Sequence, residues 1–342
     1  MAEHPRVSAV MLAYGHQPLL LRAVDAVLAS HGVVVDVVLV DNGGDRSTLD
    51  PVLDRAGVTL HSPGHNLGFA AGSNLGARVA TGDYLAFVNG DAIVDPSALG
   101  RLVAALSGAG HETVGMATAS VRLLDRPEVM NSAGNPVHFL GLSWAGGHDR
   151  PAEEFAQPRP VASASGATAV VRRSDFLELG GFCETLFTYV EDTDLSLRMW
   201  QRGLSVVYVP DAVSLHDYEF ARNPGKFYLL ERNRLFMVLT VFPTSLLLAV
   251  APVLLSFELA LLALSLKQGW GRQKVRGWWW LLRHARVIRE RRRSLRGERR
   301  ITDREFAALL TSTLDPGVPG LGVPRFAQRL LDAWWALARR LT

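Results

Sequence analysis

The sequence predicts an α/β protein with a mostly parallel central sheet and helices on both of its faces. Three short apolar runs rich in β-branched residues, at 7–12, 33–40 and 84–88, alternate with helix-like stretches at 18–31 and 70–80. This alternation is typical of βαβ units, whose strands run parallel. Ligands of such sheets bind beyond the carboxyl ends of the strands, so the loops at those ends are the place to look for a site.

Length and composition exclude several classes of protein. The 342 residues, 48% of them hydrophobic, are enough for one large core or for a catalytic domain with a smaller appendage. The single cysteine, Cys183, excludes an internal disulfide framework and chemistry between protein thiols. The first apolar run, at 7–12, is far shorter than the apolar core of a signal peptide. We therefore expect a protein of a reducing compartment.

Polar clusters stand where the three predicted strands end. They are Ala13-Tyr14-Gly15, Asp41-Asn42-Gly43-Gly44 and Asn89-Gly90-Asp91. The oxygens of Asn89 and Asp91 would suit a Mg²⁺ or Mn²⁺ ion that bridges a diphosphate. Turns prefer the same residue types, so an ordinary turn is the better explanation of each cluster taken alone. The motif G-x-G-x-x-G is absent from the first strand-to-helix turn, which disfavours a dinucleotide site.

The periodicity of apolar residues is weak between residues 107 and 165 and becomes regular again after them. The loose stretch is rich in Gly, Pro, Asn and Trp, and we expect it to form strands and loops that line the cleft. A strand is predicted at 167–171, followed by a helix with Ser174 as its N-cap and Gly180-Gly181 at its end. A further strand is predicted at 206–209.

Three acids, Glu191, Asp192 and Asp194, crowd into four positions at the start of a predicted helix that ends at Gly203. Capping and the helix dipole explain one such carboxylate but not three. Crowded carboxylates raise one another's pKa, which suits one of them to accept a proton near neutral pH. His216 lies beyond the strand at 206–209 and could return to this cleft as a metal or phosphate partner, although a lone histidine is more often structural.

The C-terminal third differs in character from the rest of the chain. Residues 235–266 carry one charge, Glu258, and contain Pro243 and Pro252. They exceed the roughly 20 residues of one membrane span but fall short of the roughly 40 that two spans need. Residues 267–300 hold 13 Lys and Arg against two Glu, a net charge of +11, so the rest of the chain carries −8.

Because basic residues flank both sides of the apolar run, both of its ends should stay on the cytoplasmic side of a membrane. We expect a broken, re-entrant or interfacial helical pair at the cytoplasmic face of the cell membrane, with the basic block on an anionic lipid surface. The alternative is a helical hairpin packed on the body, in which the two prolines mark turns.

The basic block leaves another class of protein open. Its tryptophans, Trp270, Trp278, Trp279 and Trp280, could stack on bases while the arginines bind phosphates, as in a nucleic-acid-binding protein. The block adjoins the most apolar segment of the chain, so we expect a membrane partner and no nucleic acid.

Seven motifs, taken in order, carry a resemblance to a known family. They are residues 7–14, Val40 to Gly43, Asn66 to Asn74, Asn89 to Asp91, Gly180 to Phe182, Tyr189 to Leu195, and Pro210 with His216. The series resembles an inverting glycosyltransferase of family 2 with the GT-A fold, in particular the rhamnosyltransferase-like members of bacteria that build cell-surface glycans. The match covers residues 7–234, which implies a catalytic domain at 1–234 and a C-terminal apolar and basic helical region at 235–342.

The resemblance implies a role for each motif. Residues implied in donor binding are Ala13, Tyr14, Asp41, Asn42, Asn66, Gly68, Asn89 and Gly90, with Asp41 on the nucleotide base. Asp91, the last Asp of the family's D-x-D motif, and His216 would hold Mg²⁺ or Mn²⁺. Asp192 of the Glu191-Asp192 pair would be the catalytic base. Asn89 stands where many relatives have Asp, and Cys183 stands where Asp is common.

The implied reaction moves a sugar, with rhamnose favoured, from a nucleoside diphosphate donor such as dTDP-rhamnose or a UDP-sugar. The acceptor would be a hydroxyl of a polyprenyl-linked or glycan molecule in cell-surface polysaccharide synthesis. Arg232-Asn233-Arg234 could contact the phosphates of that acceptor, or form salt bridges with the acidic body. A catalytically inactive scaffold with the same fold is the remaining alternative.

Overall fold

The computed structural model describes residues 4–107, 110, 113–217, 225–315 and 323–342, and the chain divides into two compact units. Unit 1 comprises Met1–Asn135, Ala145–Met199 and Leu204–Glu219, and unit 2 comprises Pro136–Trp144, Trp200–Gly203 and Phe220–Thr342. The predicted boundary between residues 234 and 235 falls inside a helix of unit 2, Lys226–Val241 (α7). The compact units therefore separate at an earlier position than the sequence pattern indicates.

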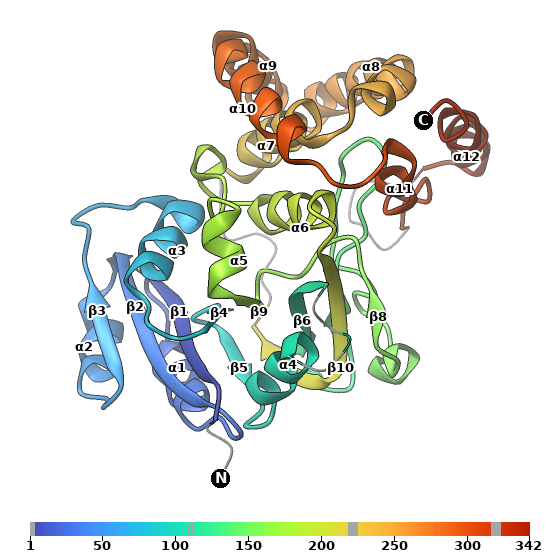
Figure 1. The fold of residues 1–342 in the computed structure, drawn as a ribbon. Coiled ribbons are helices and arrows are strands. Elements are labelled where there is room, and N and C mark those ends of the chain that lie inside the picture. Colours follow the sequence, from blue (N-terminus) through green and yellow to red (C-terminus); the bar gives the residue numbers. More distant parts are fainter. Residues whose placement is uncertain (1–3, 108–109, 111–112, 218–224, 316–322) are drawn as a thin grey trace. The chain divides into compact units, whose positions relative to one another are not determined.

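Unit 1 is built on one mixed sheet (Figure 1). Its strands are β1 (Arg6–Gly15), β2 (Val34–Gly44), β3 (Val58–His61), β4 (Tyr84–Val88), β5 (Ala92–Val94), β6 (Val114–Leu123), β7 (Met130–Ser132), β8 (Arg159–Pro160), β9 (Thr168–Arg172) and β10 (Ser205–His216). The order is β3-β2-β1-β4-β9-β6-β10-β5, with β7 beside β6 and β8 beside β10. The first four strands in this order are parallel, as predicted, and β9 runs antiparallel to both β4 and β6.

Helices cover both faces of this sheet (Figure 1). They are α1 (Leu20–Leu28), α2 (Arg46–Leu53), α3 (Gly68–Val79), α4 (Ala98–Ser107), α5 (Arg173–Glu178) and α6 (Glu191–Gln201), whose last two residues belong to unit 2. Alternate residues of a strand point to opposite faces. Ala9 and Met11 of β1 accordingly pack into the core beneath α1 and α4, whereas Val10 and Leu12 meet α3 on the other face.

Two glycines set the distance between α3 and the sheet. A Cβ atom on Gly72 would lie 2.8 Å from the Leu12 side chain, and one on Gly76 would lie 2.5 Å from the Val10 side chain. Such distances are shorter than any stable contact, so only glycine allows the helix to lie this close. The close packing brings the N-terminus of α3 to the edge of the sheet where β1 and β2 end.

Two details of the predicted elements are wrong. Helix α5 begins at Arg173 with Arg172 in the N-cap position, so Ser174 lies inside its first turn and is not the cap. The chain enters this helix directly from β9, which leaves no loop residue for a cap. The strand predicted at 206–209 extends to His216, because its pairing with β6 shifts at 210–212 and then resumes. His216 is therefore the last residue of β10.

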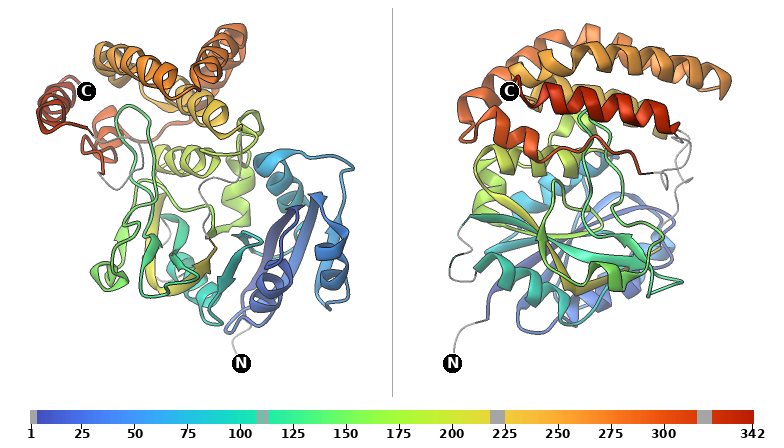
Figure 2. Two further views of the ribbon diagram at one scale, coloured as in Figure 1. Left: turned by 180° about the vertical axis from the view of Figure 1, so that it is seen from behind. Right: turned by 90° about the vertical axis from the view of Figure 1, so that its right-hand side faces the viewer.

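The described residues of unit 2 lie at 136–144, 200–203, 225–315 and 323–342, and they are mostly helical apart from the turns and isolated bridges of 136–144 and 309–315. Besides α7 it contains α8 (Thr244–Lys267), α9 (Gly271–Arg283), α10 (Ala285–Glu298), α11 (Asp303–Ala308) and α12 (Arg325–Ala338). Pro243 separates α7 from α8, whereas Pro252 lies inside α8 and marks no turn, so only one of the two prolines behaves as the hairpin alternative requires. Figure 2 shows α8 as one long helix.

Helix α8 has the length and composition of a membrane-crossing helix. Its 24 residues contain a window with a mean hydropathy of 2.4, of which 28% is buried. Among the helices of the described ranges it is the only one that meets these criteria, which core helices of soluble proteins also meet. The apolar run therefore forms one long helix after Pro243, with the remaining residues in α7.

Candidate active site

The strand register brings the predicted polar clusters to one edge of the sheet. Ala13 of β1 lies opposite Asp41 of β2, and Val10 of β1 lies opposite Phe87 of β4. Because these strands are parallel, the residues that follow them emerge on the same side. The first three clusters, which lie far apart in the sequence, are therefore neighbours at the carboxyl edge of the sheet.

Asp41 is held as an anion at the end of β2. Its Oδ1 accepts hydrogen bonds from the backbone N–H groups of Gly43 (3.1 Å) and Gly44 (2.9 Å), and its Oδ2 accepts one from the Ser62 hydroxyl (3.1 Å). Burial raises the pKa of Asp41, but the hydrogen bonds from Gly44, Gly43 and Ser62 outweigh burial and lower the pKa below its ordinary value. Asp41 therefore presents a charged acceptor at neutral pH.

Asn42 and Asn66 shape the turn before α3. Asn42 is buried, and its side chain accepts a hydrogen bond from Leu67 N (2.7 Å) and donates one to Gly68 O (3.2 Å). Asn66 Oδ1 accepts a hydrogen bond from Gly68 N (2.8 Å). Gly68 has a φ of +77°, and a Cβ atom there would lie 2.5 Å from Phe187. Both ends of the Asn42 amide are thus used within the protein, so Asn42 positions this turn.

Gln17 joins the loop after β1 to the turn at 89–91, a role that was not predicted from the sequence. Its Oε1 accepts a hydrogen bond from Tyr14 N (2.9 Å), and Tyr14 itself is 61% exposed. A Cβ atom on Gly90 would lie 2.8 Å from Gln17 Nε2, so a side chain at position 90 would displace the end of Gln17. The available signal was the position of Gln17, three residues after Tyr14 in a loop already expected to line the site.

Asp91 and His216 meet, as the sequence analysis proposed for a metal site. His216 Nε2 lies 3.2 Å from Asp91 Oδ1, and the other ring nitrogen, Nδ1, lies 3.0 Å from Asn131 Oδ1. An amide oxygen can only accept, so His216 Nδ1 carries the proton. In a neutral ring Nε2 then directs a lone pair at the carboxylate, an arrangement that a cation between the two groups would stabilise.

The donor set fits a divalent ion that is partly coordinated by substrate. A carboxylate oxygen and an imidazole nitrogen held by a second residue are typical ligands, and Mg²⁺ commonly takes its remaining ligands from water and substrate phosphates. Within the part of the chain that the structure describes, no group of three or more His, Cys, Asp and Glu side chains could hold a metal. Asp91 and His216 would therefore share the ion with a diphosphate. The orienting residue Asn131 was not found from the sequence.

Glu191 and Asp192 open α6, and their environments differ. Asp192 is partly exposed, and it accepts hydrogen bonds from Gly166 N (3.0 Å) and Thr193 N (2.7 Å). Burial raises the pKa of Asp192, against the effect of these hydrogen bonds. Glu191 is buried, and its Oε2 has no hydrogen-bond partner among the described residues. Burial, together with the charge of Asp192, raises the pKa of Glu191 well above the ordinary value.

The two carboxyl groups therefore differ in how readily they ionise. Two backbone N–H groups stabilise the anion of Asp192, whereas Oε2 of an ionised Glu191 would be buried without a donor among the described residues. Asp192 is therefore the member of the pair that ionises at the lower pH, and Glu191 keeps its proton to higher pH. This difference in acidity suits Asp192 to act as a general base, because the neighbouring carboxyl group stays neutral while Asp192 is ionised.

One short segment ties this pair to the turn that carries Asp91. Gly166 donates its N–H to Asp192, and the next residue, Ala167, accepts a hydrogen bond from Asn89 N (3.0 Å). Thr168 and Ser214 then share a hydrogen bond of 2.8 Å between their hydroxyls, two residues before His216. The structure thus brings Asp91, Asp192 and His216 to the same end of the sheet.

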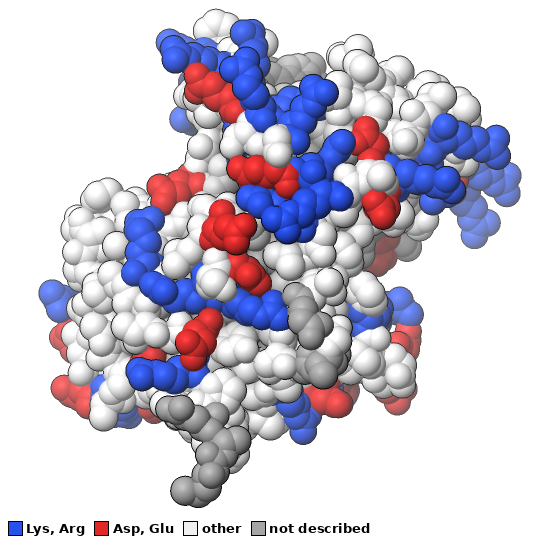
Figure 3. All heavy atoms as spheres, viewed as in Figure 1, with Lys and Arg blue, Asp and Glu red and all other residues white. Residues whose placement is uncertain are grey.

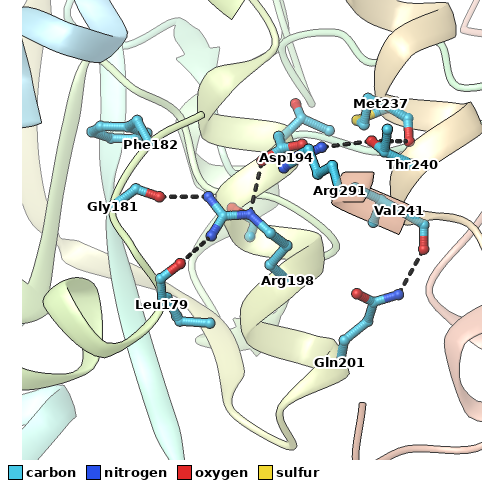
Figure 4. A network of polar contacts seen from close by, with 12 residues as sticks. Leu179, Gly181, Phe182, Asp194, Arg198, Gln201, Met237, Thr240, Val241 and Arg291 are labelled. Carbon is cyan, nitrogen blue, oxygen red and sulfur yellow. Dashed lines mark hydrogen bonds and ion pairs between the residues drawn. The ribbon is translucent and has the colours of Figure 1, made fainter. Parts of the chain in front are cut away.

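The third acid of the cluster, Asp194, is structural. It is fully buried, and its Oδ2 lies 2.8 Å from Nε of Arg198, one helical turn later (Figure 4). The same guanidinium donates hydrogen bonds to Leu179 O (2.8 Å) and Gly181 O (2.6 Å). The Asp194–Arg198 pair therefore fastens α6 to the turn after α5, while the charge of Asp194 still adds, after burial and the charge of Asp192, to the raised pKa of Glu191.

The proposed phosphate contact of Arg232-Asn233-Arg234 is wrong for Arg234. This side chain is buried in unit 2 and pairs with Glu231 (2.9 Å) and with Glu258 of α8. Lys274, also fully buried, lies 2.6 Å from Glu231 and 2.9 Å from Glu258. The partner carboxylates belong to α7 and α8, because a buried cation in an apolar bundle needs a counter-charge within the same unit.

Comparisons with known proteins identify the family of the chain. The profile of Glycosyl transferase family 2 matches residues 8–180. The chain is 30% identical, over 63% of its length and 78% of the relative, to N-acetylglucosaminyl-diphospho-decaprenol L-rhamnosyltransferase of Mycobacterium tuberculosis. It is 31% identical to the O-antigen biosynthesis protein RfbC of Myxococcus xanthus, over 64% of this chain and 18% of that protein.

A solved structure shares the fold. The crystal structure of GalNAc-T7 with UDP, GalNAc and Mn²⁺ superposes with a TM-score of 0.58 at 17% identity. The match covers 70% of this chain and 48% of that one, so this chain spans about half of that structure.

Proposed function

The chain belongs to glycosyl transferase family 2 and to its rhamnosyltransferase-like branch, and from this premise we propose an inverting, metal-dependent rhamnosyltransferase of polysaccharide synthesis. It has the GT-A fold. The observation that carries the proposal is the Gly166-Ala167 segment, which bonds Asp192 on one side and the turn of Asp91 on the other. A base and a metal-binding carboxylate are thereby fixed near one another.

Two relatives support the donor and the pathway. One is named as a rhamnosyltransferase that acts on a diphospho-decaprenol carrying N-acetylglucosamine, and the other as a protein of O-antigen biosynthesis. We propose a nucleoside diphosphate sugar as donor, with dTDP-rhamnose favoured over UDP-sugars. The acceptor is a hydroxyl of a lipid-linked or glycan molecule.

The acid pair performs the proton transfer in this proposal. Asp192 accepts the proton of the acceptor hydroxyl as that oxygen attacks the anomeric carbon from the face opposite the leaving group, so the configuration inverts. Glu191 retains its own proton and thereby avoids a second negative charge beside the base. No covalent sugar–enzyme intermediate forms, and no nucleophilic side chain is needed.

The opposite side of the site binds the donor. Asp41 accepts a hydrogen bond from the nucleotide base, and the exposed Tyr14 ring flanks the same pocket. Asp91 and His216 would hold a divalent cation, which neutralises the charge that develops on the leaving diphosphate. Asn131 fixes the ring of His216 and keeps its proton on Nδ1. Positioning of both substrates supplies a large part of the remaining acceleration.

We place the protein at the cytoplasmic face of the membrane, as a peripheral or re-entrant protein. Exposed leucines on α8, at 248, 255, 259 and 266, are spaced so that they share one face of the helix. A second apolar face runs along α12 and just beyond it, and it is formed by the exposed side chains of Phe326, Leu330, Leu337 and Leu341. Figure 3 shows Lys and Arg side chains gathered over α9 and α10. Apolar faces beside basic ones are typical of helices at an anionic lipid surface.

The alternative of nucleic-acid binding receives less support from the tryptophans. Trp270 is buried against Phe227, Trp280 stacks on His284 at 4.0 Å, and Trp278 donates a hydrogen bond to Glu258. Of the four indoles, Trp279 alone is largely exposed, at 58%. Stacking of successive bases requires several exposed rings.

A donor screen tests the proposal. Purified protein is heated with a panel of nucleoside diphosphate sugars and Mn²⁺, and a true donor should raise the melting temperature. Transfer to a diphospho-polyprenol acceptor is then followed, and NMR of the product gives the anomeric configuration. A retained configuration, or stabilisation by no member of the panel, would refute the proposal.

A further inference from the structure

Unit 2 contains a cavity of about 90 Å³ where the end of α7, the start of α8 and the last turns of α10 come together. Its lining includes Arg292, Arg296, Arg299, Thr244 and Asp303. We call it the arginine pocket. A cavity of this size holds several water molecules, and hence has room for a tetrahedral oxyanion.

The three arginines are not equally compensated. Arg299 pairs with Asp303, whose second oxygen accepts a hydrogen bond from Ser245. Arg292 donates to two neutral oxygens, Leu239 O (2.7 Å) and Thr244 Oγ1 (3.0 Å), so its charge has no counter-ion there. Arg296 is exposed and makes no hydrogen bond or ion pair with the described residues. Two positive charges of the pocket are therefore not neutralised.

Electrostatics at the pocket are unfavourable without an anion. Burial and then the charges of Arg296 and Arg299 lower the pKa of Arg292. Repulsion among fixed guanidinium groups is relieved when one anion bonds them together, and planar guanidinium groups match the oxygens of phosphate. The N-terminus of α8 begins at the same pocket, and its free N–H groups and dipole add to the positive potential.

We propose that the arginine pocket binds a phosphoryl group, with Arg296 and Arg292 as its main ligands. The phosphoryl group can come from an anionic phospholipid headgroup or from a soluble phosphate. The exposed leucines of α8 begin at Leu248, one turn after Thr244, so a lipid that covers this apolar face carries its phosphate near the pocket. The inference rests on unit 2 alone and makes no assumption about sugar transfer.

The test compares Arg296→Gln with Arg293→Gln in the full-length protein. Arg293 lies on the same helix, is exposed, and does not line the pocket, so both variants lose one surface charge from α10. Neither side chain forms a hydrogen bond or ion pair with the described residues, so both variants should match the parent protein in melting temperature when no phosphate is present.

The two sources are separated by two probes at equal ionic strength. Inorganic phosphate should raise the melting temperature of the parent protein and of Arg293→Gln, with little effect on Arg296→Gln. Phosphatidylcholine vesicles containing phosphatidylglycerol should bind Arg296→Gln about tenfold more weakly than Arg293→Gln, since one charge-assisted hydrogen bond is lost. If the two variants differ with both phosphate and vesicles, the pocket binds lipid headgroups. If they differ with phosphate alone, the pocket binds a soluble phosphate.

Equal behaviour of the two variants with both probes would overturn the proposal. The binding of vesicles would then be a diffuse effect of net charge, and it should fall equally in both variants as salt is added.

Discussion

The backbone N–H of Gly166 donates a hydrogen bond of 3.0 Å to Oδ2 of Asp192. A Cβ atom at position 166 would lie 3.4 Å from the same oxygen, an ordinary van der Waals distance, so this approach does not depend on glycine. The neighbouring carbonyl of Ala167 binds Asn89 N, at the turn of Asp91. One dipeptide thus sets the distance between the proposed base and the proposed metal ligand.

Replacing Asp192 by Asn should lower the transfer rate about a thousandfold, because a general base commonly contributes a factor of this order. Donor affinity should stay within about twofold, since the carboxylate acts on the acceptor. Single-turnover transfer and calorimetric donor binding measure the two effects. Unchanged transfer would identify a scaffold, and a lost donor affinity with normal turnover would place Asp192 in the donor site.

The transfer rate should rise with pH on the acid side of its profile, because Asp192 works in its ionised form. Burial raises the pKa of Asp192, so this limb should lie at higher pH than an ordinary aspartate would give. The Glu191→Gln variant should keep the limb close to its position in the parent protein, because Glu191 is already neutral when Asp192 ionises. Loss of the limb in that variant would make Glu191 the base.

The same variant should be more stable than the parent protein at neutral and alkaline pH. In the unfolded chain Glu191 ionises near its model value of 4.5, whereas burial raises its pKa well above that value in the folded state. Between these two pKa values the folded state binds more protons, so the free energy of unfolding falls as pH rises. Glutamine cannot ionise, and its advantage in melting temperature should shrink as the pH is lowered towards about 4.

Transfer should stop in EDTA and return with Mg²⁺ or Mn²⁺, because Asp91 and His216 form an incomplete site that a divalent ion completes. Replacing Asn131 by Leu should weaken metal binding about tenfold to a hundredfold, as loss of a partner that orients a ligand commonly does. Isothermal titration with Mn²⁺ measures this affinity without any assay of activity. Full transfer in EDTA would remove the metal from the mechanism.

Replacing Glu258 by Leu should lower the free energy of unfolding by about 3–5 kcal/mol. Arg234 and Lys274 would then be buried with only Glu231 as counter-charge. The matched control is Glu290→Leu, which breaks an exposed pair with Arg286 (2.7 Å) and should cost no more than about 0.5 kcal/mol. Similar results for both variants in chemical denaturation would contradict the structural role of the buried cluster.

The double variant Leu255→Gln, Leu259→Gln should partition into membranes at least about tenfold less than the parent protein, because each exposed leucine loses apolar contact with lipid. Leu177→Gln, an exposed leucine of α5, is the control and should partition normally. Fractionation before and after a high-salt wash measures the apolar share of binding. A protein that stays soluble and shifts nucleic acid in gels would favour the nucleic-acid alternative.

Local patterns were sufficient to predict many elements. The strands at β1, β2 and β4 and the helices α1 and α3 follow from apolar periodicity, which depends on neighbouring residues only. The boundary at Ser174 and the end of β10 were wrong, since the first depends on how β9 enters α5 and the second on pairing with β6 across a bulge. Such features are set by contacts between distant segments.

The candidate site likewise combines features that local sequence predicts with features that only long-range contacts determine. The sequence singled out Asp41, Asp91, Asp192 and His216 from their residue types and order. It did not distinguish Asp194, which is neutralised by Arg198, from the two acids before it, and it missed Gln17 and Asn131. Their roles depend on which side chain lies opposite, information that no local pattern contains.

The sequence by itself determined the class of fold, the family and the residues able to act as base and metal ligand, because these follow from periodicity, residue chemistry and order along the chain. Only the tertiary structure decided which carboxyl group keeps its proton and which arginines are neutralised. The reason is that a pKa and an ion pair depend on burial and on partners brought together by folding.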